Sequence, residues 1–268
     1  STQSRSSAAS DVYKRQDTLS VALGAMATAP GSAGPTPVVL GHYSGAGGAQ
    51  SSATLLPAIS QLLADAGWRL DELDAIVFGA GPGSFTGLRT ACSVAQGLAL
   101  GAGLRVIPVD TLMCVAEEAR YQYTLSHPGE SPCSRVAAAM DARMDEIYLG
   151  VFEWPAGLSS PSTGLPAARG EAGLAAPEAL DLPADTLVAG NARAVFGERL
   201  PAATRALPFV HCLPTATALL RLAPALLQRG DAVDPALAMP RYVRDKVAKT
   251  TAERLAERQA AAVAAAPR

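Results

Sequence analysis

Residues 79–89 carry the side chains best placed for chemistry, because a glycine-rich loop there joins a strand pattern to a helix pattern. The loop reads Gly-Ala-Gly-Pro-Gly-Ser-Phe-Thr-Gly-Leu-Arg, after apolar residues at 75–78 and before a helical repeat at 88–100. A strand, a glycine-rich turn and a helix in this order bring the backbone close to a phosphate, another ligand or another helix. Phosphate binding and a serine nucleophile are therefore the two chemistries to test.

The loop departs from each standard motif for those chemistries. A P-loop needs Lys-Ser/Thr after its last glycine, whereas Gly87 is followed by Leu-Arg. A dinucleotide fingerprint would have Ser84 or Thr86 in place of its third glycine. A nucleophile elbow reads Gly-x-Ser-x-Gly, but Ser84 directly follows Gly83. We therefore interpret Ser84 as the N-cap of the next helix. Gly83 is expected to adopt a conformation reserved for glycine or to allow a close neighbour.

The histidines do not form a metal site in the sequence. Two imidazoles four residues apart on a helix can share a metal ion. The chain has three histidines, none at that spacing: His42, His127 and His211. A Ser-His-Asp hydrolase centred on Ser84 would need distant loops to converge. We interpret the histidines as surface or loop residues and predict no metal ligand and no catalytic residue.

Three other charged residues are candidate functional groups. Asp17 lies at a strand end, as do aspartates that hold nucleotide-bound metals, but the following Thr-Leu-Ser is not a phosphate cradle. Asp141 and Arg143 are interpreted as a turn pair that bonds nearby backbone, rather than as an acid–base couple. Residual nucleotide binding stays open as an alternative.

The order of elements predicts an α/β fold in two halves. Strands are expected at 19–23, 38–40, 75–79 and 106–109, and helices at 53–66, 85–101 and 112–121, which is the order of a ribonuclease-H-like half. The second half begins near residue 135, with strands at 136–139, 147–152 and 187–189 and a helix at 217–228. The Pro/Gly/Ala-rich stretch 155–183 is predicted to be a long, mobile insertion. Residues 250–268 form an alanine-rich tail.

The first 16 residues do not fit this pattern. They are polar, serine-rich and basic, and we interpret residues 1–16 as an artefactual or disordered extension. A divergent edge strand is the alternative.

Composition excludes broad electrostatic attraction to nucleic acid, because the net charge is −2. The four cysteines are far apart and contain no Cys-x-x-Cys pair, which suits a reducing cytoplasm. No apolar run reaches membrane-spanning length and no signal-peptide pattern is present, so we expect a cytoplasmic protein.

The helix at 85–101 also predicts an interaction surface. It has no charged residue after Arg89 and is apolar nearly all round, so it has to be covered on both sides. A sheet covers one side. A partner's helix is expected on the other, with a helix of the same chain as the alternative.

The motifs together resemble one family. The glycine-rich loop is similar to the signature of the TsaB (YeaZ) family, and we call it the signature loop. Its residues are Gly81, Pro82, Gly83, Ser84, Phe85, Thr86, Gly87 and Arg89. The family's strand-to-helix turn resembles residues 109–112, its Asp-Ala-Arg turn resembles 140–148, and its C-terminal Pro-x-Tyr-x-Arg resembles 240–244. The resemblance runs in order from about residue 17 to about residue 249.

The resemblance implies a non-catalytic subunit with an actin-like, sugar-kinase-like (ASKHA) fold of two ribonuclease-H-like subdomains, 17–124 and 135–249. Such a subunit binds and activates a TsaD-like threonylcarbamoyl transferase, which modifies adenosine beside the anticodon of tRNA. ATP and metal are expected on the partners, which include a TsaE-like ATPase, and none on this chain. A homodimer is also possible, and tRNA is reached through the complex. A small-molecule kinase or transferase of the same fold is the alternative function.

The family's partner interface maps onto the two helices already described. The residues expected there are Leu55, Leu56, Ile59, Leu88, Thr90, Val94, Gly97 and Leu98.

Overall fold

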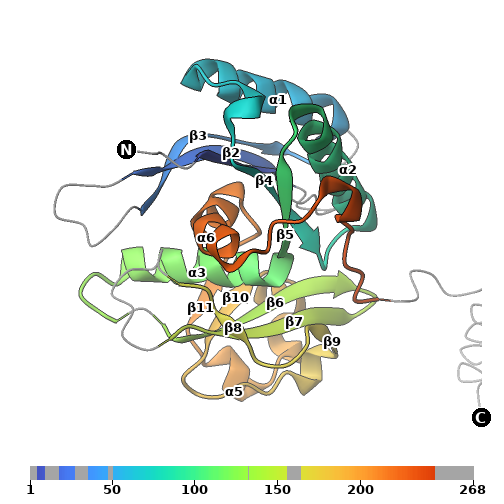
Figure 1. Cartoon of the computed structure of the whole chain (residues 1–268). Helices are drawn as coiled ribbons and strands as arrows, with labels where there is room; N and C mark the ends of the chain where they lie inside the picture. The colour runs from blue at the N-terminus through green and yellow to red at the C-terminus, as the bar shows by residue number, and fades with distance from the viewer. Residues whose placement is uncertain are drawn as a thin grey trace, which may run out of the picture.

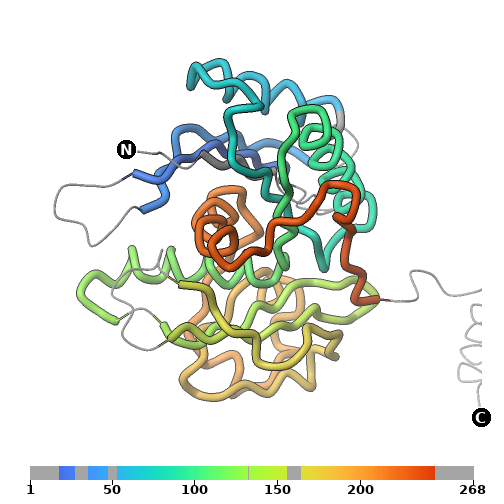
Figure 2. Tube along the Cα trace, viewed as in Figure 1, coloured from blue at the N-terminus to red at the C-terminus, as the bar shows by residue number. Residues whose placement is uncertain are grey.

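The computed structural model describes residues 5–9, 18–27, 36–47, 51–131, 133–155 and 164–244. Figure 1 shows two β-sheets stacked with helices between them and on both outer faces, and Figure 2 follows the same path as a tube. Asp17 and the tail 250–268 lie outside the described residues.

The first sheet has the order β3-β2-β1-β4-β5. Its strands are β1 (Arg5–Ala9), β2 (Thr18–Ala27), β3 (Thr36–Ala46), β4 (Ala75–Gly81) and β5 (Arg105–Asp110). Strand β1 pairs antiparallel with β2 and parallel with β4. The sheet is therefore mixed, with a parallel part that carries the signature loop at the end of β4.

Helices cover both faces of this sheet. Helix α1 (Ser51–Ala66) packs on β2 and β3, and α2 (Phe85–Ala102) on β4 and β5, while α6 (Ala216–Arg229) packs on the opposite face. Side chains of β4 alternate accordingly: Ile76 and Phe78 pack towards α2, and Val77 packs towards α6. Strand β4 is buried on both faces, as expected for a strand in a parallel region.

The second sheet repeats the connectivity of the first. Its order is β11-β10-β6-β7-β8, with β9 also paired to β7. The strands are β6 (Arg135–Arg143), β7 (Glu146–Glu153), β8 (Ala167–Ala168), β9 (Gly173–Ala175), β10 (Leu187–Gly190) and β11 (Phe209–His211). In the first sheet β1 pairs antiparallel with β2 and parallel with β4, which pairs parallel with β5. In the second sheet β6 pairs antiparallel with β7 and parallel with β10, which pairs parallel with β11.

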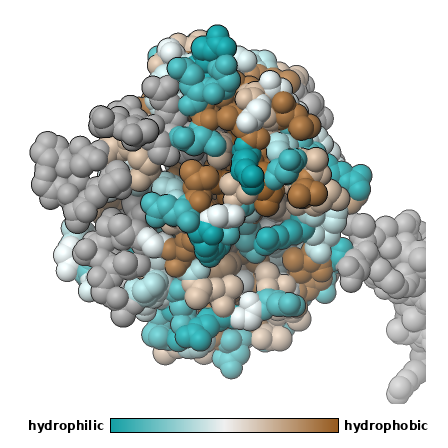
Figure 3. All heavy atoms as spheres, in the orientation of Figure 1, coloured by the Kyte–Doolittle hydropathy of each residue, from teal (hydrophilic) through white to brown (hydrophobic). Residues whose placement is uncertain are grey.

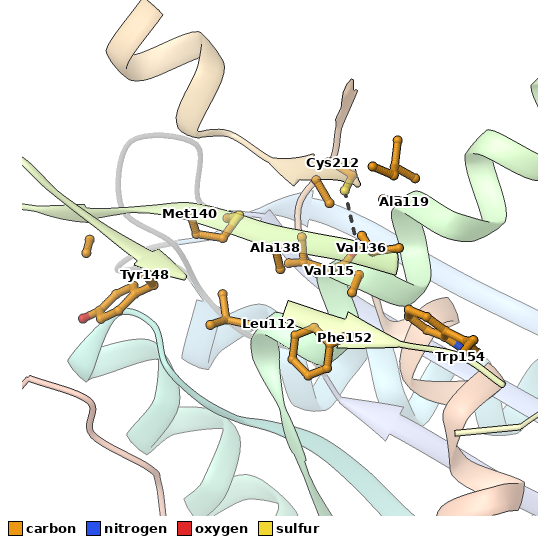
Figure 4. Packing of buried hydrophobic residues seen from close by; sticks show 14 residues of the cluster. Leu112, Val115, Ala119, Val136, Ala138, Met140, Tyr148, Phe152, Trp154 and Cys212 are labelled. Carbon is orange, nitrogen blue, oxygen red and sulfur yellow. Dashed lines mark hydrogen bonds between the residues drawn. The ribbon is translucent and has the colours of Figure 1, made fainter. Parts of the chain in front are cut away.

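Helix α3 (Thr111–Ser126) lies between the sheets beside α6 and covers the second sheet. Leu112, Val115 and Ala119 of α3 pack against β6 and β7, as Figure 4 shows. The short helices α4 (Ala192–Phe196) and α5 (Ala202–Arg205) lie on the second half, as do the 3₁₀ turns η3 (Pro177–Ala179) and η4 (Gly197–Arg199). The turn η2 (Leu70–Glu72) precedes β4, and η5 (Pro235–Leu237) follows α6.

The N-terminal residues differ from the sequence interpretation. Residues 1–16 were expected to be an extension or an edge strand, but Arg5–Ala9 forms β1 in the middle of the first sheet. The polar sequence of β1 hides its role, whereas the backbone hydrogen bonds show it. Without β1, two strands in the middle of the sheet would have unpaired edges.

The predicted mobile insertion at 155–183 is wrong for its described C-terminal part. Strands β8 and β9 pair with β7, and Leu180 and Leu182 are buried in the core of the second half. Residues 156–163 lie outside the described residues. The Pro/Gly/Ala composition predicted a loop, but the leucines at its end supply apolar area that the core buries.

A buried charged cluster joins the two central helices. Arg221 of α6 lies 3.0 Å from Glu117 and 2.7 Å from Glu118, both on α3. Burial raises the pKa of Glu117 to about 7, against the charges of Arg221 and Arg120. The pKa of Glu118 is lowered, because Arg221, Gln122 and Thr215 outweigh its burial.

The raised pKa of Glu117 gives a signed pH dependence. The folded state holds this proton more tightly than the unfolded state, so the group's contribution to stability is complete below about pH 4.5 and is lost as the pH rises through about 7. Glu117→Gln cannot ionise. Its free energy of unfolding, relative to the unsubstituted chain, is therefore expected to rise between pH 5 and pH 8 in urea titrations. A difference that is flat or falls with pH contradicts the assignment.

Candidate functional site

The signature loop is shaped by one close backbone contact. Gly81 ends β4 with φ of 118°, and a Cβ atom there would lie 2.3 Å from the carbonyl oxygen of Arg241. Its N–H donates to Thr111 Oγ1 at 3.0 Å, while the N–H of Arg241 donates to the carbonyl of Ala80 at 2.6 Å. Gly81 is therefore a position that requires glycine. Gly83, which was expected to adopt a conformation reserved for glycine or to allow a close neighbour, does not have a positive φ.

Ser84 occupies the N-cap position of α2, as predicted, but its hydroxyl makes no capping hydrogen bond. The prediction of a side-chain cap is wrong, because α2 begins with only the Ser84 carbonyl accepting from the N–H of Leu88 at 2.9 Å. Helix α3, by contrast, does have a side-chain cap: the Asp110 carboxylate accepts hydrogen bonds from the N–H groups of Leu112 and Met113. Burial raises the pKa of Asp110, against those two donors and the charge of Arg241.

A C-terminal segment runs along one flank of α2, and we call residues 232–244 the strap. Its start is held on β5, where Val233 bridges Val106. Its middle is held by Gln96, whose Nε2 donates to the carbonyls of Pro235 at 3.0 Å and Ala238 at 3.1 Å. The strap therefore runs antiparallel to the helix and reaches the signature loop.

The end of the strap joins the signature loop to the second half. Arg89 Nε donates to the Tyr242 hydroxyl at 3.1 Å, and the rings of Phe85 and Tyr242 lie 5.3 Å apart. The Arg89 guanidinium stacks 3.8 Å from the Phe85 ring centre. Arg244 pairs with Glu146 at 2.5 Å. The loop, the strap and the β6–β7 hairpin therefore meet at one junction.

In the turn of the β6–β7 hairpin, Asp141 bonds nearby backbone, as the sequence predicted. Its carboxylate accepts from the N–H of Arg143 at 2.9 Å, and its own N–H donates to Asn191 Oδ1 at 2.8 Å. Arg244 Nη2 donates to the carbonyls of Ala142 and Arg143. These contacts satisfy backbone groups, so the Asp-Ala-Arg turn has a structural role at the junction.

The candidate catalytic residues do not converge within the described part of the chain. His42 lies on the edge strand β3, His127 stacks on Tyr123 beyond the end of α3, and His211 is on β11. Among the described residues, no cluster of three His, Cys, Asp or Glu side chains could hold a metal ion. Three cysteines are buried: Cys92, Cys114 and Cys212.

The structure divides the predicted interface residues into two groups. Leu55, Ile59 and Leu88 are buried in the chain's own core, so the expectation that they contact a partner is corrected for these three. The sequence pattern marks an apolar face but does not show which part of it the sheet covers. The other five are accessible. Leu56 and Gly97 are exposed, and Thr90, Val94 and Leu98 are half-buried.

The outward face of α2 carries two glycines. A Cβ atom at Gly97 or Gly101 would meet no atom of the described chain within 4 Å. Beside these glycines, Leu100 is 63% exposed. Leu100 was not among the predicted site residues, nor were Leu237 and Met239 of the strap. Helical spacing could have identified Leu100, but only the fold brings the strap beside α2.

Comparison with known proteins identifies the family. Residues 47–266 match the family model of TsaD, described as tRNA N6-adenosine threonylcarbamoyltransferase. The fold is similar to that of YeaZ from Pseudomonas aeruginosa, with a TM-score of 0.69 and 32% identity, covering 89% of this chain and 99% of that one. The chain belongs to the TsaB (YeaZ) family.

Within the described residues, no helix is long and apolar enough to cross a membrane.

Curated members of the TsaB family match a shorter part of the chain. The protein named tRNA threonylcarbamoyladenosine biosynthesis protein TsaB from Haemophilus influenzae is 48% identical over 94 residues, which is 35% of this chain and 36% of the relative. The Escherichia coli protein of the same name is 41% identical over 99 residues, or 37% and 39%. The matched segments thus span less than two fifths of these relatives.

The junction predicts a sharp difference between two loop positions. Gly81→Ala places a Cβ against the Arg241 carbonyl in a backbone conformation that side chains rarely adopt, and is expected to cost about 1–3 kcal/mol of unfolding free energy. Ser84→Ala should change it by less than about 0.5 kcal/mol, because no side-chain cap is lost. Urea unfolding measures both. Equal effects at the two positions would show that the close contact does not constrain the loop.

Proposed function

We propose that this chain is a non-catalytic subunit that binds and activates a TsaD-like threonylcarbamoyl transferase. The complex would make threonylcarbamoyladenosine next to the anticodon of tRNA. The names of the TsaB relatives support this biosynthetic role. ATP and metal would be bound by the partners, including a TsaE-like ATPase.

We further propose that the two halves are ribonuclease-H-like subdomains of an actin-like, sugar-kinase-like fold. The repeated strand order and strand directions of the two sheets support this. The first subdomain would then begin at β1 rather than at residue 17, since β1 is the central strand of its sheet.

The outward face of α2 is the observation that carries the binding proposal. A glycine inside a helix costs about 1 kcal/mol relative to alanine. No close neighbour within the described chain requires glycine at position 97 or 101, because a Cβ at either position would have open space around it. A partner helix that approaches closely would use the missing side chains. Helices α1 and α2, which carry the accessible residues of the predicted interface, form one outer layer on the first sheet (Figure 1).

The signature loop supports a binding subunit over a kinase. Its glycine with positive φ accommodates the Arg241 backbone, and its arginine stacks on Phe85 and binds Tyr242. These groups are therefore committed to packing within the chain, whereas a kinase needs backbone N–H groups and cations directed at a phosphate.

The proposal predicts that stability and binding change in opposite directions. Gly97→Ala and Gly101→Ala should each stabilise the isolated chain, by up to about 1 kcal/mol, because helix propensity improves. Each should weaken binding to the catalytic subunit, because a methyl group separates the helices. Calorimetry measures both the stability and the binding affinity, and Gly97→Leu serves as a larger substitution at the same position. Variants that are more stable and bind with unchanged affinity would refute the proposed contact.

A reconstituted reaction tests the activating role. The isolated chain should transfer no threonylcarbamoyl group to tRNA, while its addition to the catalytic and ATPase subunits should raise the rate. Gly97→Leu should reduce that increase in proportion to lost binding. Transfer by the isolated, repurified chain would contradict a non-catalytic role.

A further inference from the structure

The strap presents large apolar side chains to solvent beside α2. Leu237 is 73% exposed and Met239 is 68% exposed. They do not belong to a loose segment, because Gln96 binds the carbonyls on both sides of Leu237, at Pro235 and Ala238. Cys92 Sγ also lies 3.5 Å from the Ala238 carbonyl. The exposed side chains are thus held in place against the helix.

Helical geometry places these residues next to the glycine face. Gln96 and Leu100 are one turn apart and lie on the flank of α2 that meets the strap. Gly97 and Gly101 each follow by one position, which turns them towards the outward face. Leu100 therefore lies between the strap and the glycines. Figure 3 shows hydrophobic residues on the upper half of the molecule, over the region that α2 and the strap occupy in Figure 1.

The chemistry of this surface restricts what it can bind. From residue 90 to residue 102 on α2, and from 235 to 240 on the strap, the chain has no charged residue. A nucleic-acid surface needs lysine or arginine to neutralise phosphates. An uncharged surface with large apolar side chains beside glycines instead fits an apolar helix, whose ridge can lie along the glycines.

We infer that Leu237 and Met239 of the strap, together with Leu100, form one side of the docking surface whose centre is Gly97 and Gly101. The occupant is an uncharged helix of the catalytic transferase subunit, so the inference rests on the proposed function. The strap thereby adds a contact that the two-helix interface does not include. It also connects the docking surface to the second half of the chain, because Arg244 at its end binds the β6–β7 hairpin.

The inference is tested by charging the strap. Leu237→Lys combined with Met239→Lys should leave the melting temperature within error, because both side chains are exposed, and should weaken binding to the catalytic subunit at least about tenfold. The matched control is Leu125→Lys, since Leu125 is 64% exposed on α3 and away from the strap. The control should bind as the unsubstituted chain does. Leu237→Ser alone gives a second, milder variant should the double variant fold poorly.

The outcomes separate this inference from the proposed function. If the strap variants bind normally while Gly97→Leu does not, the strap contact is wrong and the α2 interface stands. If the unsubstituted chain does not bind the catalytic subunit, the proposed function fails, and this inference with it. Sedimentation velocity of the chain alone provides a further arm. A dimer that the strap substitutions dissociate, with binding to the catalytic subunit unchanged, would show that a second copy is the occupant and overturn the inference.

Discussion

The close approach of the strap to the signature loop is the constraint on which the rest of the arrangement depends. The Arg241 carbonyl oxygen lies only 2.3 Å from where a Cβ of residue 81 would be, and the Arg241 N–H donates to the Ala80 carbonyl. This contact fixes the strap at the start of α2. It therefore places Tyr242 on Arg89 and brings Arg244 to the β6–β7 hairpin. A loop that resembles a ligand-binding turn in sequence is thus used to join two halves of one chain.

Because the signature loop is used for packing within the chain, the outward face of α2 is the better candidate for a binding surface. The glycine with a positive φ, the arginine and the hairpin carboxylate all have partners within the chain. The outward face of α2 differs, because its glycines have open space around them. Between the two sheets, the buried ion pairs of Arg221 with Glu117 and Glu118 hold α6 to α3. These ion pairs join the two halves of the chain beneath the outer layer formed by α1 and α2.

Local pattern predicted much of this fold and the tertiary contacts supplied the rest. Helix 85–101 and strand 75–79 correspond to α2 and β4 within two residues at each end, because period and bounding glycines mark them clearly. The sequence did not predict the role of Gly81, because the residue that packs against it, Arg241, belongs to a segment far along the chain. The same separation hides the contact between Arg89 and Tyr242, which are 153 positions apart. Strand β1 was missed because its residues lack apolar alternation. The burial of Leu88 was misjudged because spacing alone does not show which face meets the sheet.

Hydrogen–deuterium exchange of the chain, alone and with the catalytic subunit, measures whether the partner binds on the outward face of α2. Exchange should become slower on binding in α1, α2 and the strap and stay unchanged in α4, α5 and β11, because the partner covers the outer layer of the first half. Protection centred on α4 and α5, or on the β6–β7 hairpin without α2, would show that the partner binds elsewhere and that the outward face of α2 is not the docking surface.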